Sequence, residues 1–124
     1  MGLSISQAAR RTLLSEHTLR YYDREGLMPL LKRNASKIRD FSENDIAWLE
    51  LICCLKTSGM SLEEIKNFMN LCLKGPDTCE ARREMLQQHK KNILNQMEKL
   101  QLSLETVDYK IEHYKEIGIF HIDG

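Results

Sequence analysis

The most regular pattern of apolar residues lies in the last third of the chain. From residue 93 onward, apolar positions recur at alternating intervals of four and three, the spacing of a coiled-coil seam. The seam positions are Ile93, Met97, Leu100, Leu104, Val107, Ile111 and Tyr114. They predict one long helix over about 78–115, and they favour its pairing with the same helix of a second chain. The alternative is a helix folded back on its own domain.

Shorter helices are predicted before this segment by their capping residues. Three segments begin with a serine that is followed three positions later by Gln, Asp or Glu, the pattern of a capping box. The pairs are Ser4/Gln7, Ser42/Asp45 and Ser61/Glu64. They predict helices over about 5–11, 43–57 and 62–73. A further helix is expected between Ser15 as its cap and Gly26 as its end, and within it Leu19 and Tyr22 fall three apart and can share a buried face.

The first two helices and the segment after them predict a nucleic-acid-binding architecture. Two short helices with a tight connection form a helix-turn-helix, whose second helix can enter a major groove. After Pro29 the chain reads as two extended runs around a polar turn at residues 34–37. This hairpin is basic, as expected for a wing that lies on a phosphate backbone. Its charged residues are Lys32, Arg33, Lys37 and Arg39.

The predicted helix over residues 43–57 has two apolar stripes. We expect such a broad apolar surface to be buried on more than one side. One stripe consists of Ile46, Leu49 and Cys53, and the other of Ala47, Leu51 and Cys54.

The charge distribution changes this picture only slightly. The formal net charge is zero, but residues 1–41 contain eight Lys and Arg against four Asp and Glu, which gives +4 there and −4 in the remainder. The basic part is compatible with a polyanionic partner. The N-terminus has no signal-peptide pattern and no segment is apolar enough to span a bilayer. We therefore expect a cytoplasmic protein without a membrane partner, whose four cysteines are reduced thiols.

Three motifs identify a known family. The segments TLRYYDREGL, IRDFSENDI and LKTSGMSLEEI, in this order and spacing, closely resemble the MerR family of bacterial transcription regulators over residues 4–73. The resemblance implies a mostly helical fold, with a winged helix-turn-helix domain at 1–75 and a dimerisation helix with a short tail at 76–124. It also implies an antiparallel coiled-coil homodimer that bends and untwists a near-palindromic promoter site for RNA polymerase.

The resemblance also implies which side chains contact DNA. Arg20 and Tyr21 are expected at phosphates, and Tyr22 is expected to support or share that role unless it packs in the core with Leu19. The remaining expected contacts are base reading by Glu16, His17 and Thr18, and backbone contacts by Arg39 in the wing and Lys56 at the end of a helix.

The sequence departs from the family pattern at two turns. The helix-turn-helix turn often carries Gly in the family, whereas this chain has Thr12-Leu13-Leu14. The wing turn often carries Asn-Gly or Gly-Gly, whereas this chain has Ser36-Lys37. Lys37 is therefore expected to add a DNA contact of its own.

The effector is indicated by the cysteines. Only nine residues follow Lys115, which leaves no room for the ligand domain of drug-binding members. ICCLKTSGM resembles a subgroup that responds to aldehydes and thiol-reactive stress, and it makes Cys54 the expected sensor. The negative end of the helix dipole opposes a thiolate at Cys54, so a reactive thiol there needs a cation such as Lys56.

Alternative readings of the cysteines and of the whole chain stay open. A metal-responsive regulator using Cys79 is one, although metal-sensing members also carry thiols near the end of the dimer helix. Cys53 and Cys72 lie on predicted core stripes. A coiled-coil adaptor without DNA binding is a further alternative. We expect neither an enzyme nor a bound cofactor or metal, since the sequence has no nucleophile–base pattern, phosphate loop or paired metal motif.

Overall fold

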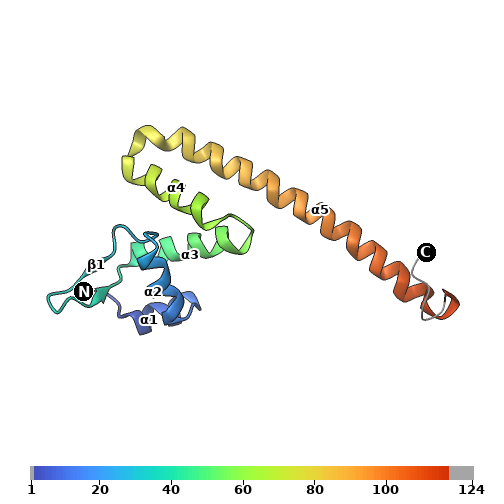
Figure 1. Ribbon diagram of the computed structural model, residues 1–124, viewed down its shortest axis with the longest axis horizontal. Helices are drawn as coiled ribbons and strands as arrows, with labels where there is room; N and C mark the ends of the chain where they lie inside the picture. Colours follow the sequence, from blue (N-terminus) through green and yellow to red (C-terminus); the bar gives the residue numbers. More distant parts are fainter. Residues whose placement is uncertain (1, 118–124) are drawn as a thin grey trace. The chain divides into compact units, whose positions relative to one another are not determined.

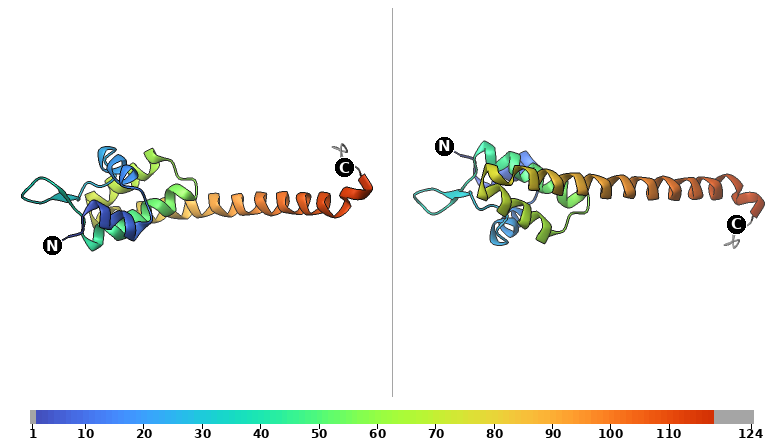
Figure 2. Two further views of the ribbon diagram at one scale, coloured as in Figure 1. Left: turned by 90° about the horizontal axis from the view of Figure 1, so that it is seen from below. Right: turned by 90° about the horizontal axis from the view of Figure 1, so that it is seen from above.

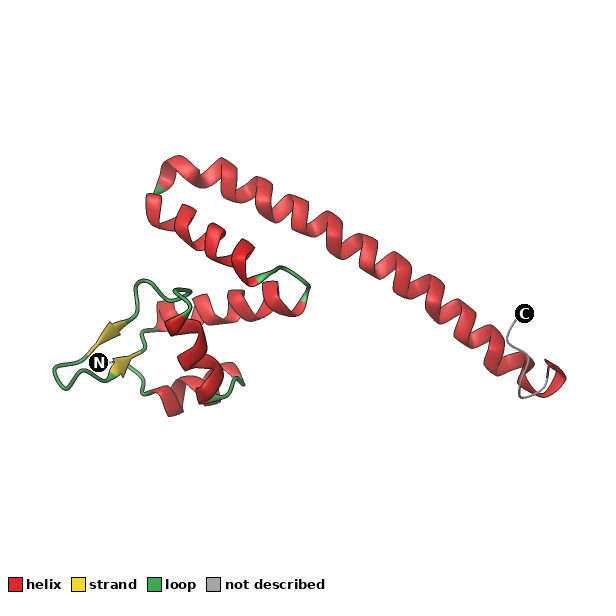
Figure 3. Ribbon diagram, in the orientation of Figure 1, coloured by secondary structure: helices red, strands yellow, loops and turns green. Residues whose placement is uncertain are grey.

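The computed structural model describes residues 2–117 and has the predicted helical fold with a small β wing (Figure 1). In chain order the elements are α1 (Ile5–Thr12), α2 (Glu16–Arg24), β1 (Lys32–Arg33), β2 (Arg39–Asp40), α3 (Glu43–Thr57), α4 (Leu62–Lys74), a 3₁₀ turn η1 (Pro76–Thr78) and α5 (Cys79–Ile117). Figure 3 shows how small the hairpin is beside the helices. The helix boundaries fall within about two residues of those predicted from the capping residues.

The chain divides into two compact units, Met1–Met85 and Leu86–Gly124. The first contains the helix-turn-helix, the wing, α3, α4 and the first turns of α5, so it extends past the boundary at residue 75 that the sequence suggested. The second contains the remainder of α5.

The capping residues explain why the helices begin where they do. In α1 the hydroxyl of Ser4 accepts from the backbone N–H of Gln7 at 3.2 Å, and the Gln7 side chain accepts from the Ser4 N–H at 2.8 Å. The same reciprocal pair forms at the starts of α3 and α4. At α2 the Ser15 hydroxyl accepts from the N–H of Thr18 at 3.0 Å. Each bond satisfies a backbone donor that has no partner inside its helix.

The turn between α1 and α2 contains a strained residue. Leu13 ends α1 with φ = 61° and its side chain is 91% exposed. A left-handed conformation costs a residue with a side chain about 1–2 kcal/mol, which explains why glycine is common at such a turn. The flanking helices pack on each other and fix this conformation despite its cost.

The core of the first unit is formed by the inward faces of α1 to α4 together with the segment that connects α2 to the wing. Leu19 and Tyr22 of α2 are both buried, as their spacing predicted. The other buried hydrophobic residues of this core are Ala8, Leu27, Met28, Phe41, Ile46, Leu49, Ile52, Leu55, Met60, Ile65 and Met69. The exposed face of α2 is therefore held on a packed support.

The prediction of two buried stripes on α3 was only half right. The first stripe is buried at Ile46 and Leu49, and Cys53 at its end is half-buried. On the second stripe, however, Ala47 and Cys54 are exposed within the single chain. The helices of the first unit cover the first stripe, whereas the second is covered only in part, at Leu51, which packs against the core. Cys54 is therefore not buried within the single chain.

The wing is anchored at its base by the N-terminus. Strands β1 and β2 are antiparallel, with Lys32 opposite Asp40 and Arg33 opposite Arg39. Beyond β2, Phe41 and Leu3 exchange two backbone hydrogen bonds of 2.7 and 2.9 Å, a pairing that the sequence pattern did not indicate. Both views in Figure 2 show the hairpin projecting away from the helices of its unit.

Helix α5 leaves the predicted seam uncovered within the single chain. The exposed seam residues are Met97, Leu100, Leu104, Val107, Ile111 and Tyr114, while Ile93 is half-buried. A row of exposed apolar residues on one face of a helix is typical of a surface that pairs with another helix. The dimer itself stays a prediction. No described helix is long and apolar enough to cross a membrane.

Candidate nucleic-acid interface

The outward face of α2 carries most of the predicted contact residues. Its inward positions, Leu19 and Tyr22, fix the rotation of the helix on the core. This rotation leaves His17, Arg20 and Tyr21 exposed. A helix held in this way offers donors and an aromatic edge along one face, which is the arrangement needed to enter a major groove.

Two of the predicted contact residues pair with each other. A terminal nitrogen of Arg20 lies 3.1 Å from a carboxylate oxygen of Glu16, one turn earlier on α2, and both side chains are about half exposed. An exposed pair of this kind contributes about 0–1 kcal/mol. A phosphate can therefore replace Glu16 as the partner of Arg20 at little cost in free energy. The Glu16 carboxylate would then be available to accept a hydrogen bond from a cytosine amino group.

Thr18 is less available than the sequence suggested. Its hydroxyl accepts a hydrogen bond from the Ser15 hydroxyl at 2.9 Å, and its N–H is the donor of the helix cap. Thr18 thus helps to form the start of α2, while the exposed His17 beside it has a more accessible side chain.

The two adjacent tyrosines occupy different environments. Their ring centroids lie 6.2 Å apart, but Tyr21 is exposed whereas the Tyr22 side chain is only 6% exposed. Burial, reinforced by the neighbouring Cys53 and Tyr21, raises the pKa of Tyr22 above its ordinary value of 10.0. The structure therefore places the Tyr22 ring in the core with Leu19, which is one of the two roles that the sequence left open for it.

The difference between the tyrosines gives a direct test. Tyr21→Phe should weaken DNA binding about 30-fold, because the predicted homodimer loses two accessible hydroxyl donors worth about 1 kcal/mol each. Tyr22→Phe, the matched control, should change affinity by less than twofold. Fluorescence anisotropy with a labelled duplex measures both. An equal loss in the two variants would return Tyr22 to the set of DNA contacts.

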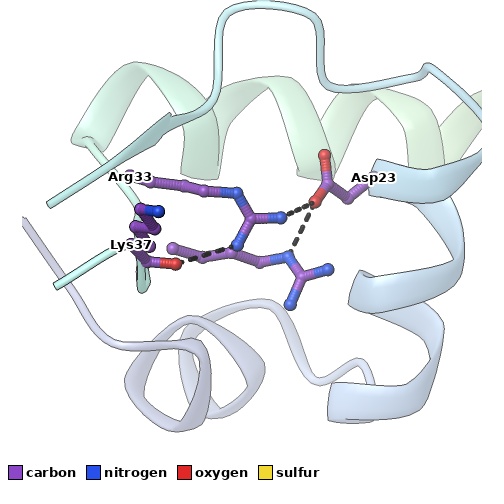
Figure 4. Close-up of polar contacts among 4 residues, drawn as sticks. Asp23, Arg33 and Lys37 are labelled. Carbon is purple, nitrogen blue, oxygen red and sulfur yellow. Dashed lines mark hydrogen bonds and ion pairs between the residues drawn. The ribbon is translucent and has the colours of Figure 1, made fainter.

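Arg39, the predicted phosphate clamp of the wing, is already held in place by α2. Its Nε donates to Asp23 Oδ2 at 2.7 Å, and Arg33 Nη2 approaches the same oxygen at 3.4 Å (Figure 4). In the part of the chain that the structure describes, the two terminal nitrogens of Arg39 make no hydrogen bond, so they can serve a phosphate. Sequence reasoning missed Asp23, although an acidic residue in the last turn of a helix is unfavourable and could have drawn attention.

The wing tip is shaped by Asn34 and Lys37. The Asn34 side-chain oxygen accepts from the N–H groups of Ser36 and Ile38 at 2.9 and 3.1 Å, and Lys37 has φ = 63°. Lys37 thus adopts the conformation that glycine takes more easily, and its side chain is exposed at the tip. The last predicted contact, Lys56, is separate from this group and lies exposed on the final turn of α3.

Ion pairs connect the helix-turn-helix to its supporting helices. Arg11 of α1 makes a two-pronged contact with Glu43 of α3, at 2.9 and 3.1 Å. This hydrogen bond lowers the pKa of Glu43 below its ordinary value and raises that of Arg11. Lys66 of α4 lies 3.4 Å from Glu25 at the end of α2. These contacts help to hold the two short helices on α3 and α4.

Comparison with known proteins agrees with this architecture. The family model described as MerR HTH family regulatory protein matches residues 3–72, and the one described as MerR, DNA binding matches residues 46–108. The chain belongs to the MerR family. Like its relatives, this MerR-family protein is a DNA-binding transcription regulator and not an enzyme.

Similar proteins cover most of this regulator. An uncharacterized HTH-type transcriptional regulator of Haemophilus influenzae is 37% identical over 94% of this chain and 86% of its own length. AdhR, an HTH-type transcriptional regulator of Bacillus subtilis, is 39% identical over 74% of this chain and 66% of AdhR. The crystal structure of HiNmlR, a MerR family regulator lacking the sensor domain, bound to promoter DNA, has a TM-score of 0.87 and 37% identity. It covers 94% of this chain and 93% of that one.

Proposed function

We propose that this regulator binds a near-palindromic promoter site as a homodimer, distorts it for RNA polymerase, and responds to an aldehyde or other thiol-reactive compound through Cys54. The DNA part rests on the winged helix-turn-helix described above. It is supported by the similarity to HiNmlR, which was solved on promoter DNA.

The homodimer is supported by the uncovered seam of α5. Leu100, near the middle of the seam, is 69% exposed in the single chain. Burying such leucines against a second helix is favourable by about 25 cal/mol for each Å² of apolar surface. A dimer would also place two winged units on one DNA duplex, which explains why a near-palindromic site is proposed.

The exposed thiol of Cys54 is the observation that carries the sensor assignment. A reagent dissolved in water must reach the sulfur atom, and Cys54 is exposed whereas Cys53 and Cys72 are half-buried. Cys72 in addition lies against Arg82, with 3.8 Å between the sulfur and a guanidinium nitrogen. Cys79, the thiol of the metal-responsive alternative, is also exposed, but the described residues contain no group of three potential metal ligands.

The chemistry at Cys54 needs no further reagent. The sulfur adds to the carbonyl carbon of an aldehyde, the C=O π electrons move to oxygen, and the thiol proton ends on that oxygen to give a hemithioacetal. Because Cys54 is exposed, the added group changes the surface of α3 and does not strain a packed interior. A change of a few kcal/mol between two DNA-bound shapes is enough to switch a population.

Substituting Cys54 with serine should separate sensing from DNA binding. Cys54→Ser should bind promoter DNA within twofold of wild type but lose formaldehyde-induced transcription in a reconstituted assay. Cys53→Ser, the adjacent and less exposed thiol, is the matched control and should keep induction. A Cys54→Ser variant that responds like wild type would overturn the assignment, and loss of the response in Cys79→Ser would then identify Cys79 as the sensor.

A further inference from the structure

A carboxylate of α2 lies between two arginines of the wing. Asp23 Oδ2 accepts from Nε of Arg39 at 2.7 Å and lies 3.4 Å from Nη2 of Arg33. The side chains of Asp23 and Arg39 are only 21% and 20% exposed. Figure 4 shows Asp23 on α2 facing Arg33 across the space between the helix and the hairpin. These contacts connect the two elements that carry most of the predicted DNA contacts.

The local energetics indicate that this arrangement stabilises both the wing and the end of α2. Arg33 and Arg39 are direct cross-strand partners, and like charges in that position destabilise a hairpin. Asp23 lies in the last turn of α2, where the helix dipole disfavours a negative charge. Each unfavourable placement is offset by the other, because the carboxylate neutralises part of the paired positive charge.

The same contacts extend to the wing tip. Arg33 donates through Nη1 to the backbone carbonyl of Lys37 at 3.2 Å, so one guanidinium bridges Asp23 and the residue with the left-handed conformation. The hairpin has only two residues in each strand, and a hairpin of that size is marginally stable alone. Its position therefore depends on such side-chain contacts and on the Leu3–Phe41 pairing at its base.

We propose that Asp23 is a positioning residue for DNA binding, which fixes the wing relative to the recognition helix without contacting DNA. The inference rests on the DNA interface of the proposed function. A carboxylate at the backbone would repel phosphates, but Asp23 directs Arg39 through Nε and leaves its two terminal nitrogens for a phosphate. A wing that the Asp23 contacts already hold in place in the free protein loses less conformational entropy when the protein binds DNA. Asp23 therefore contributes to discrimination of the promoter, where helix and wing must engage together.

The test compares two variants with the same change in charge, one in the last turn of α2 and one at the residue that follows this helix. Asp23→Asn removes the carboxylate that holds the wing, whereas Glu25→Gln removes the one that contacts Lys66 of α4. Each is measured on a duplex that wild-type protein selects from a random pool and on a scrambled duplex. Asp23→Asn should weaken binding to the selected duplex about tenfold and leave the scrambled duplex within twofold. Glu25→Gln should leave both within twofold.

Two further variants show whether Asp23 acts through the arginines. In a protein that already carries Arg33→Gln and Arg39→Gln, the addition of Asp23→Asn should change the affinity for neither the selected nor the scrambled duplex. Arg33→Gln alone should weaken binding to the selected duplex about threefold, and this variant decides the matter if Asp23→Asn does not fold.

Several outcomes would overturn the proposal. It is wrong if Asp23→Asn behaves like Glu25→Gln, if it weakens both duplexes equally, or if its effect persists without the arginines. It is equally wrong if Asp23→Asn does not fold and Arg33→Gln has no effect. Arg20→Ala, measured in parallel, distinguishes a failure of the positioning role from a failure of the proposed DNA interface. If it weakens binding while Asp23→Asn does not, the interface is right and the positioning role is wrong. If neither weakens binding, the interface itself is misassigned.

Discussion

Arg20→Ala should weaken binding to every DNA duplex by at least about 150-fold. A hydrogen-bonded contact between charged groups is worth about 1.5–3 kcal/mol, and a dimer loses two of them. The variant also leaves Glu16 without the guanidinium that lies 3.1 Å from its carboxylate, and an unpaired negative charge then faces the phosphates. The log–log dependence of affinity on salt should become shallower by about 1.8, at roughly 0.9 for each lost phosphate contact.

The control for this variant is Arg20→Lys, which keeps the charge and loses the planar fork of donors. It should bind with an affinity between those of wild type and Arg20→Ala. Fluorescence anisotropy at four or more salt concentrations provides both the DNA affinity and the slope of its dependence on salt. An Arg20→Ala protein that binds within threefold of wild type, with an unchanged salt dependence, would remove Arg20 from the interface.

Leu100→Asp should convert the proposed dimer into monomers. Leu100 lies near the middle of the predicted seam, and an aspartate there would place an uncompensated charge in an apolar interface at a cost of several kcal/mol. Because the effect occurs in both chains, we expect dissociation at micromolar concentration, measured by sedimentation velocity. DNA affinity should fall with it, since a monomer contacts only half of the site.

Leu102→Asp is a closely matched control for the seam. Leu102 is a leucine of the same helix, two residues away and 58% exposed, but it lies outside the four–three pattern. The same substitution at this position should leave the dimer intact. If both variants stay dimeric, or if wild type is a folded monomer, the chains do not pair through this seam.

The sequence was most informative where local chemistry determines structure. Helix starts followed from capping serines, and the Ser4–Gln7 pair forms in both directions as predicted. The buried face of α2 followed from the spacing of Leu19 and Tyr22. Such features depend on residues within one or two turns of each other, so they can be read directly from a single chain.

The features that the sequence missed depend on residues far apart in the chain. The pairing of Leu3 with Phe41 and the contact of Asp23 with Arg39 join separate elements, and no periodicity specifies such partners. The exposed side of α3 was mispredicted for a related reason. An apolar stripe that includes Cys54 indicates a surface suited to burial, but it does not say whether the same chain provides the cover.

The proposed function depends on recognition of a symmetric DNA site by a pair of winged units. Selection of duplexes from a random pool by the purified full-length protein, followed by sequencing, tests this most directly. We predict enrichment of one near-palindromic site with two inverted half-sites, bound with an affinity that falls steeply as salt rises. Enrichment of no sequence, or of a single half-site without its inverted copy, would contradict the account.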